Sequence, residues 1–210
     1  RCTCRGAPFL LAKRLQTKAY QSNAKGESTV IMEYTTQMDA ARKGIITKEM
    51  EIAAKKENMD VKELMEYMAK GQVIIPCNKL HTSIEPNAIG SMLKTKINVN
   101  LGISRDWKDM DMEIEKVNNA VKMGAESIMD LSSYGDTRTF RKRLTKECPA
   151  MIGTVPIYDA VVYYHKPLKE ITSKEWIDIV RMHAEDGVDF MTIHSVSYTH
   201  LRAHETSAHL

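Results

Sequence analysis

Two asparagines in the stretch KINVNLG at 96–102 could hydrogen-bond a polar ligand. Because side chains alternate across a strand, Asn98 and Asn100 share one face, while Ile97 and Val99 take the other. Two amides near the mouth of a strand are suited to hold polar groups of a small molecule. Asparagines in such places also bond locally within turns. The stretch therefore predicts either a ligand-binding pair or a locally hydrogen-bonded pair.

Further candidates close three other apolar runs, SIMDLS, MIGTVPIY and VDFMTIH: Met129, Asp130, Tyr158 and His194. For three of these four residues, a purely structural role is also possible. Asp130 can cap the following loop, the Tyr158 ring can be half-buried core, and His194 can be a packing residue. Their place at the carboxyl ends of predicted strands nevertheless favours a site.

Other charged or metal-binding side chains are assigned surface roles. His81 is predicted to be a surface histidine, and the basic helix at 136–147 is predicted to be solvated. HETSAH in the tail is one residue away from the H-E-x-x-H zinc pattern, but His204 and His209 would lie about 140° apart around a helix. The four cysteines form no CxxC pair. We therefore predict no metal site.

The elements that position these residues are read from the apolar pattern. Helices are predicted at 35–44, 47–58 and 60–71, the last with apolar residues three and four apart. Strands and helices then alternate, with strands at 72–76, 96–102, 127–132, 151–158 and 188–194, and helices mainly at 111–124, 136–147 and 172–187. This alternation predicts parallel β/α units.

Two architectures fit this alternation, an open doubly wound sheet and a closed (β/α)8 barrel. No G-x-G-x-x-G follows a strand, which weakens the dinucleotide-binding fold. Polar residues at the carboxyl ends of strands favour a barrel, because barrel sites lie on that face. We therefore predict an α/β fold, a partial (β/α)8 barrel with about five of the eight strands present, preceded by short helices.

Composition narrows the classes of partner. Of the 210 residues, 43% are apolar, which is enough for a sizeable core. The net charge of +3, with few aromatic residues, does not favour nucleic acid. The apolar runs are far shorter than the roughly 20 residues of a membrane span. Sparse cysteine is typical of a reducing compartment, so we predict a cytoplasmic protein that binds neither nucleic acid nor membrane.

Taken in order, several segments closely resemble the phosphomethylpyrimidine synthase family. They are MEYTTQMDAARKGIITKEMEIAAKKE, VIIPCN, KINVNLGIS, ESIMDLSSYG, MIGTVPIYDA and DGVDFMTIH. The resemblance spans 32–194. MDLS, IGTVPIY and DGVDFMTIH are specific in combination, and their order makes chance agreement implausible.

The resemblance implies a radical S-adenosylmethionine enzyme, a carbon–carbon lyase with a (β/α)8 barrel that works as a homodimer. Such enzymes rearrange 5-aminoimidazole ribonucleotide into 4-amino-5-hydroxymethyl-2-methylpyrimidine phosphate in thiamine biosynthesis, releasing formate and carbon monoxide. They use S-adenosylmethionine, a 4Fe–4S cluster and a divalent metal, zinc. The substrate-binding residues that the resemblance carries over are Asn100, Met129, Tyr158 and His194.

The chain departs from the family pattern at two places. Cys77 stands where the family usually has alanine. After TIH the family continues with Ala-Gly, whereas this sequence continues SVSYTHLRAHET. The cluster motif, a CxxC followed by a third cysteine, and the family's two metal-binding histidines are not in the sequence. We therefore expect a fragment that carries part of the substrate site, lacks the cofactor ligands and is inactive alone.

The two ends are expected to be foreign to the enzyme. Codons for AKGES can spell a ribosome-binding site just before Met32, so we predict that 1–31 is a non-native leader. Back-translation of VSYTHLRAHET resembles a transposon-derived sequencing adaptor, so we predict that 195–210 is an adaptor-derived tail. The part between, 32–194, is expected to be the N-terminal part of the barrel domain.

Two other functions stay open at this point. One is a fragment of a related radical enzyme that makes a benzimidazole from the same ribonucleotide, because both families share these motifs. The other is a stand-alone, non-catalytic nucleotide-binding module. Measured binding of the ribonucleotide by 32–194 would favour the module.

Overall fold

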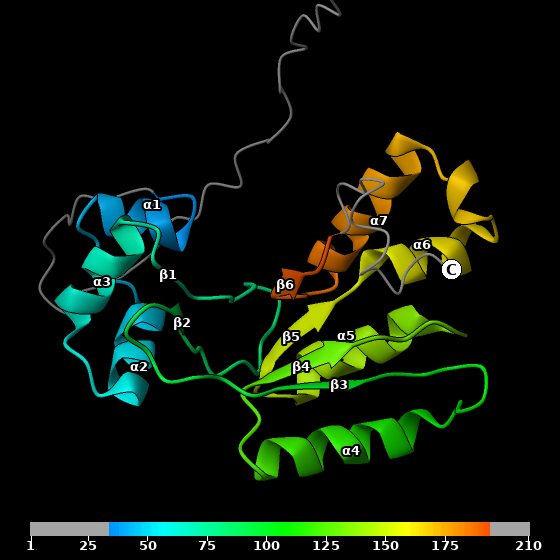
Figure 1. The fold of residues 1–210 in the computed structure, drawn as a ribbon, viewed down its shortest axis with the longest axis horizontal. Helices are drawn as coiled ribbons and strands as arrows, with labels where there is room; N and C mark the ends of the chain where they lie inside the picture. Colours follow the sequence, from blue (N-terminus) through cyan, green and yellow to red (C-terminus); the bar gives the residue numbers. More distant parts are fainter. Residues whose placement is uncertain (1–33, 194–210) are drawn as a thin grey trace, which may run out of the picture.

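The computed structural model describes residues 34–193, which fold into a helical group and a larger α/β part (Figure 1). The helical group consists of α1 (Gln37–Arg42), α2 (Lys48–Glu57) and α3 (Val61–Ala69). A two-stranded sheet follows, β1 (Val73–Ile74) with β2 (Ile89–Gly90). The α/β part consists of β3 (Asn98–Leu101), α4 (Met110–Lys122), β4 (Ser127–Asp130), α5 (Thr137–Glu147), β5 (Met151–Thr154), α6 (Pro156–Tyr164), the 3-10 turn η1 (Leu168–Glu170), α7 (Ser173–Glu185) and β6 (Phe190–Met191).

The helices begin where the sequence supplies capping side chains. Thr47 precedes α2, and its hydroxyl accepts a hydrogen bond from the Met50 amide. Before α7, the Thr172 side chain accepts from the Glu175 amide, and the Glu175 carboxylate accepts from the Thr172 amide. These bonds satisfy amides that the first helical turn leaves without partners. The predicted helix starts at these two places are confirmed.

Four of the five predicted strands form one parallel sheet in the order β3-β4-β5-β6. The order runs without reversal, as strands follow one another in a (β/α)8 barrel. The four described strands form an open sheet, so the barrel is not closed within residues 34–193. The predicted α/β class is confirmed, and within residues 34–193 the main sheet has four strands.

The fifth predicted strand, at 72–76, does not belong to the parallel sheet, which corrects the prediction. Its central residues, β1, pair antiparallel with β2 in a separate sheet. Pro76 lacks an amide hydrogen and cannot extend the ladder. Gly90 permits this pairing, because a Cβ at that position would lie 2.1 Å from the Gln72 carbonyl oxygen. A short strand between a proline and such a glycine is therefore diverted from the parallel sheet.

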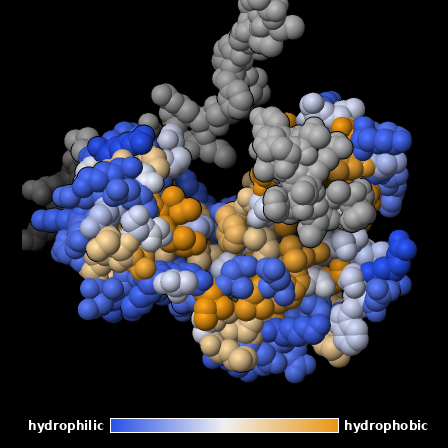
Figure 2. Space-filling model, in the orientation of Figure 1, coloured by the Kyte–Doolittle hydropathy of each residue, from blue (hydrophilic) through white to orange (hydrophobic). Residues whose placement is uncertain are grey.

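A large apolar cluster forms the core of each part, and a smaller one of Ala160, Ile179 and Met182 lies between α6 and α7. In the helical group, Met50, Leu64 and Met68 are buried against Val73. In the α/β part, Ile128 and Ile152 of the sheet are buried against residues of α4 and α5, with Ile114, Val117, Phe140 and Leu144 among them. In Figure 2, apolar residues gather in the middle of the face shown, and polar residues cover the outer helices.

The predicted solvated helix at 136–147 is wrong. Its counterpart α5 buries one side against the sheet, and Phe140, Arg141 and Leu144 are almost fully inaccessible. The sequence reading counted charges and overlooked the i, i+4 pair of Phe140 and Leu144, which places an apolar face on this basic helix. Arg141 lies beside that face and is buried with it, although arginine is rarely buried without partners.

The predicted surface location of His81 is also wrong, because its side chain is fully buried. Its Nδ1 lies 2.7 Å from Asp189 Oδ2, and its Nε2 lies 2.8 Å from the Cys148 carbonyl oxygen. The Asn78 amide donates to Asp189 Oδ1 at 2.7 Å. These bonds tie the segment after β1 to the loops that precede β5 and β6, at the amino ends of the strands.

Candidate functional site

Asn100 and Met129 are brought side by side by the register of the parallel sheet. Asn100 is the partner of Met129, and Met129 is the partner of Gly153. Residues in register point to the same face, so these side chains share the face opposite the helix-covered Ile128. Asn100 is exposed and Met129 is half-buried. Two predicted site residues therefore form a pair on the accessible face of the sheet.

Phe190 completes the same row across β5. Gly153 is the partner of Phe190, and a Cβ at Gly153 would lie 2.3 Å from the Phe190 ring. The absence of a side chain at 153 thus lets the aromatic ring lie over the strand. Phe190 was not among the residues that the sequence predicted for a site. The row now reads amide, thioether, glycine and aromatic ring.

The two asparagines of β3 are hydrogen-bonded locally, which is one of the two alternatives that the sequence left open. Asn98 Nδ2 donates to Asn100 Oδ1 at 2.9 Å, and the Ser127 hydroxyl donates to Asn98 Oδ1 at 2.8 Å. Asn98 is therefore used in local hydrogen bonding. The Asn100 Nδ2 group donates to no residue within 34–193. Asn100 is thus held by its oxygen and keeps its donor available.

Tyr158 lies in a helix and not at the end of a strand, which corrects the predicted strand 151–158. The strand β5 ends at Thr154, because Pro156 occupies the first turn of α6, where a missing amide hydrogen costs nothing. Tyr158 is half-buried, and its hydroxyl forms no hydrogen bond to the described residues. It still follows the carboxyl end of β5. His194 lies outside the described residues.

Asp130 takes its structural alternative. It is buried, and its Oδ1 accepts a hydrogen bond of 2.9 Å from the Ser132 amide, which caps the loop after β4. It lies on the helix-covered face, one residue away from Met129. Burial raises the pKa of this carboxyl to about 6, although the Ser132 hydrogen bonds and the charge of Arg141 oppose the rise.

Replacing Asp130 by asparagine is expected to stabilise the chain at pH 7 by about 2–3 kcal/mol, since its pKa of about 6 lies above the ordinary value of about 3.9 and each pKa unit corresponds to about 1.4 kcal/mol. The folded pKa lies above the unfolded value of about 3.9. The contribution of Asp130 is therefore fully present below about pH 4 and is lost as the pH rises through about 6. Asparagine keeps the acceptor for Ser132 and does not titrate.

Urea unfolding of the chain between pH 4 and 7 measures this prediction. Part of the decrease in the wild-type free energy of unfolding with rising pH should come from Asp130. Asp130→Asn should remove this part, whereas Asp106→Asn, at an exposed loop position, should retain it. Parallel curves for wild type and Asp130→Asn across this range would contradict the prediction.

A buried polar network that the sequence did not reveal lies behind β5. The Thr154 hydroxyl lies 2.8 Å from His183 Nδ1, and His183 Nε2 lies 2.9 Å from Asp159 Oδ2. Arg141 Nη1 donates to the same Asp159 oxygen at 3.2 Å, and the Thr137 hydroxyl donates to the other. A signal for His183 exists in its spacing of four from Ile179, which places both on the buried side of α7.

The charges of this network are matched. Burial alone would raise the pKa of Asp159, but the His183 hydrogen bond, the Arg141 charge and the Thr137 hydroxyl together hold it below its usual value. Burial lowers the pKa of His183, so its ring is neutral. A neutral ring that faces a carboxylate with Nε2 carries its proton there and accepts the Thr154 hydroxyl at Nδ1. The bond directions are therefore assigned throughout.

The hydroxyl–imidazole–carboxylate order of Thr154, His183 and Asp159 resembles a nucleophilic triad in its connections. All three side chains are buried, with the Thr154 residue 1% exposed. A nucleophile must reach a substrate, and this hydroxyl faces helices on the outer side of the sheet. The arrangement is therefore a structural connection between β5, α6 and α7.

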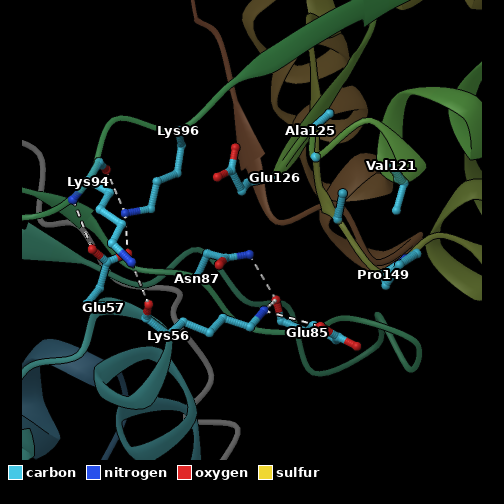
Figure 3. Close-up of a pocket in the computed structure, with 12 residues that line it drawn as sticks. Lys56, Glu57, Glu85, Asn87, Lys94, Lys96, Val121, Ala125, Glu126 and Pro149 are labelled. Atoms are coloured by element: carbon cyan, nitrogen blue, oxygen red, sulfur yellow. Dashed lines mark hydrogen bonds and ion pairs between the residues drawn. The ribbon is translucent and has the colours of Figure 1, made fainter.

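One cavity lies at the opposite end of the sheet, near the amino ends of β3, β4 and β5 (Figure 3). Its volume is about 350 Å³. Lys96 Nζ lies 2.5 Å from Glu57 Oε1 and Lys56 Nζ lies 3.3 Å from Glu85 Oε2, so cations and carboxylates are paired along one wall. A second cavity of about 430 Å³ lies beside α1 and β1.

Neither cavity contains Asn100, Met129 or Tyr158. The cavities and the carboxyl ends of the strands therefore indicate different places for a binding site. The strand-end position carries more weight, because there the Asn100 Nδ2 group, which donates to no residue within 34–193, lies in one row with the half-buried Met129 thioether. Paired charges at the amino ends of barrel strands are typical of stabilising contacts.

The described residues do not fit a metal or iron–sulfur centre. No group of three or more His, Cys, Asp or Glu side chains within 34–193 could hold a metal ion. The two described cysteines are separate, and burial raises the pKa of Cys77 to about 11 and raises that of Cys148. Cluster ligands must be thiolates, which a raised pKa opposes. Within the same residues, no helix is long and apolar enough to cross a membrane.

A family model and the similar known proteins both relate this chain to the same family. The model of the Radical SAM ThiC family matches residues 36–209. The protein named phosphomethylpyrimidine synthase of Alkaliphilus oremlandii (strain OhILAs) is 67% identical over 164 residues, which cover 78% of this chain and 38% of that protein. The protein of the same name from Clostridium botulinum (strain 657 / Type Ba4) is 64% identical over 163 residues, covering 78% and 37%. The chain thus spans less than two-fifths of these relatives, and it belongs to the Radical SAM ThiC family.

Proposed function

We propose that this chain is part of a phosphomethylpyrimidine synthase and supplies side chains that hold 5-aminoimidazole ribonucleotide. The observation that carries the proposal is the row on the accessible face of the sheet, where Asn100 and Met129 are register partners. Identity of 67% to a relative of that name supports the same reading. The four parallel strands would then be part of a (β/α)8 barrel, with this row on the inner face and the ligand at the carboxyl ends.

Each side chain has a distinct proposed task. The Asn100 Nδ2 group donates to an acceptor on the ribonucleotide, because its oxygen is already bonded to Asn98. The Met129 thioether packs against the imidazole ring, a contact that sulfur makes well with aromatic rings. The Tyr158 hydroxyl forms a further hydrogen bond, and His194 is proposed as the fourth contact. Together they hold the substrate in one orientation, which lowers the entropic part of a barrier.

The cofactors that the family implies are S-adenosylmethionine and a 4Fe–4S cluster, which together would generate the radical. Zinc, a homodimeric assembly and a cytoplasmic location belong to the same proposal. The residues within 34–193 do not fit a cluster or metal, so we assign them no step in the radical chemistry. Their proposed part is substrate binding, and we expect the chain by itself to bind without turnover.

Titration calorimetry of the chain with 5-aminoimidazole ribonucleotide tests this proposal. Tyr158→Phe and Asn100→Ala should each weaken binding about fivefold to tenfold, the value of one hydrogen bond. Tyr163→Phe and Asn119→Ala are matched controls, because both residues are exposed on helices away from the row. Equal affinities for Asn100→Ala and wild type, or no binding by the wild-type chain, would contradict the proposal.

The proposal can also be tested in a complete enzyme. A hybrid of the Alkaliphilus oremlandii protein, with its 164 matching residues exchanged for those of this chain, should convert the ribonucleotide to the pyrimidine phosphate. A hybrid that folds, carries its cofactors and makes a benzimidazole would replace the proposed product by the alternative one.

A further inference from the structure

The turn that carries Tyr158 is closed by a histidine from another helix. Tyr158 lies between Thr154, the last residue of β5, and Asp159, in the first turn of α6. His183 of α7 bonds to both, at 2.8 Å to the Thr154 hydroxyl and 2.9 Å to the Asp159 carboxylate. One imidazole therefore spans the segment in which Tyr158 stands.

This connection has little freedom to relax. Thr154, Asp159 and His183 are all buried, so water cannot readily replace a lost bond. Asp159 is also held from α5 by Arg141 and by the Thr137 hydroxyl. The Tyr158 amide donates to the Val155 carbonyl at 3.1 Å, which fixes the backbone of the turn itself. The first turn of α6 is therefore held on three sides.

We propose that His183 is a positioning residue for ligand binding, because it joins Thr154 to Asp159 and thereby fixes the turn that presents Tyr158. This inference rests on the proposed function, in which Tyr158 contacts the ribonucleotide. His183 itself lies behind the sheet and touches no ligand. Its contribution is to keep the Tyr158 hydroxyl in place before binding, as supporting residues do for a preorganised site.

The substitution His183→Leu removes both bonds, and His183→Gln is the conservative counterpart. A glutamine amide has its oxygen and nitrogen at a spacing similar to the two ring nitrogens, so it can accept from Thr154 and donate to Asp159. His183→Leu should weaken ribonucleotide binding about fivefold to tenfold, as much as Tyr158→Phe does. His183→Gln should recover most of this affinity. An equal loss in both His183 variants would contradict the proposal.

A double-mutant cycle separates positioning from general stability. If His183 acts through Tyr158, then Tyr158→Phe with His183→Leu should bind no more than about twofold weaker than Tyr158→Phe alone. The proposal would be overturned if the losses of affinity from the two substitutions multiplied in the double variant. An unchanged affinity in His183→Leu would also overturn it. Ile114→Ala, a buried position on α4, is the control that loses stability without touching this turn. At temperatures where it is folded, it should bind like wild type.

A measurement without ligand distinguishes this proposal from the function on which it rests. Tyrosine-ring NMR of the labelled chain, with the Tyr158 signal assigned through Tyr158→Phe, reports the environment of that ring. The signal should shift or broaden in His183→Leu, return in His183→Gln and stay unchanged in Ile114→Ala. If the wild-type chain binds no ribonucleotide, the proposed function fails, and the ring signal still decides whether His183 fixes the turn. An unmoved signal in His183→Leu overturns the inference.

Discussion

Replacing Arg141 by methionine is expected to lower the free energy of unfolding by about 3–5 kcal/mol, because it leaves the buried Asp159 carboxylate without its cation. Arg141 is 1% exposed, and its guanidinium donates to Asp159 at 3.2 Å and to Asp186 at 3.0 Å. Methionine fills a similar volume, so the loss reports the charge and not a cavity. Asp186 keeps Arg138 nearby, whereas Asp159 keeps only neutral donors.

The pH dependence of this loss has a definite sign. Burial opposes ionisation of Asp159, yet hydrogen bonds and the Arg141 charge hold its pKa below the usual value. A depressed folded pKa contributes stability above the unfolded pKa of about 3.9, and that stability is lost as the pH falls through the folded value. Arg141→Met removes part of this contribution. The difference between wild type and variant should therefore shrink below about pH 4.

Urea unfolding of both proteins from pH 3 to pH 7 measures the loss and its pH dependence. Arg143→Met is the matched control, since Arg143 on the same helix is about one-third exposed and pairs with Glu147 at i, i+4. Exposed pairs of this kind contribute about 0–1 kcal/mol. A loss in Arg141→Met no larger than in the control would show that the buried network does not need its cation.

Arg141 also shows where sequence reasoning stops. RTFRKR reads as a charged surface because four of its six residues are basic. Periodicity alone would place Phe140 and Leu144 inward, but it gives no reason for a guanidinium to join them. The reason is Asp159 of α6 and Asp186, the residue that follows α7, which meet Arg141 only in the fold. A partner that is 45 residues away in the chain leaves no local signal.

The strand-end residues were easier to predict because their signal is local. Alternation in KINVN places Asn98 and Asn100 on one face, and the structure shows them hydrogen-bonded to each other there. The neighbour relation of Asn100 and Met129 depends on register, which the sequence does not give. For Tyr158, the reading extended β5 through Pro156. Proline is also favoured at the first turn of a helix, and here it begins the helix α6.

The two faces of the parallel sheet divide the work. One face carries the row of Asn100, Met129 and Phe190, where the Asn100 Nδ2 group donates to no residue within 34–193. The other face carries matched buried charges that hold α5, α6 and α7 in place. Substitutions on the first face should change affinity with little loss of stability. Substitutions on the second should change stability first, and affinity only where, as at His183, they reach the turn of Tyr158.

The amino ends of the strands provide the contrasting case, Asp189→Asn, which should cost about 3 kcal/mol or more. Asp189 Oδ2 accepts from the Ile152 amide and from His81 Nδ1, both at 2.7 Å, and Oδ1 accepts from the Asn78 amide at 2.7 Å. His81 Nε2 lies 2.8 Å from the Cys148 carbonyl oxygen, so the ring is held at both nitrogens. Asparagine removes a buried carboxylate oxygen that accepts hydrogen bonds and turns an amide donor toward one of these donors.

Urea unfolding should show this loss in Asp189→Asn and almost none in Asp178→Asn, whose side chain is 41% exposed and pairs with Arg181. Hydrogen exchange should quicken at the Ile152 and Asn78 amides, since their acceptor is impaired. Ribonucleotide affinity should stay unchanged in conditions where the variant is folded, because Asp189 lies at the end of the sheet opposite to Tyr158. Weakened binding by the folded variant would mean that the two ends are coupled, and a loss under about 1 kcal/mol would mean that the three hydrogen bonds to Asp189 do not stabilise the fold as predicted.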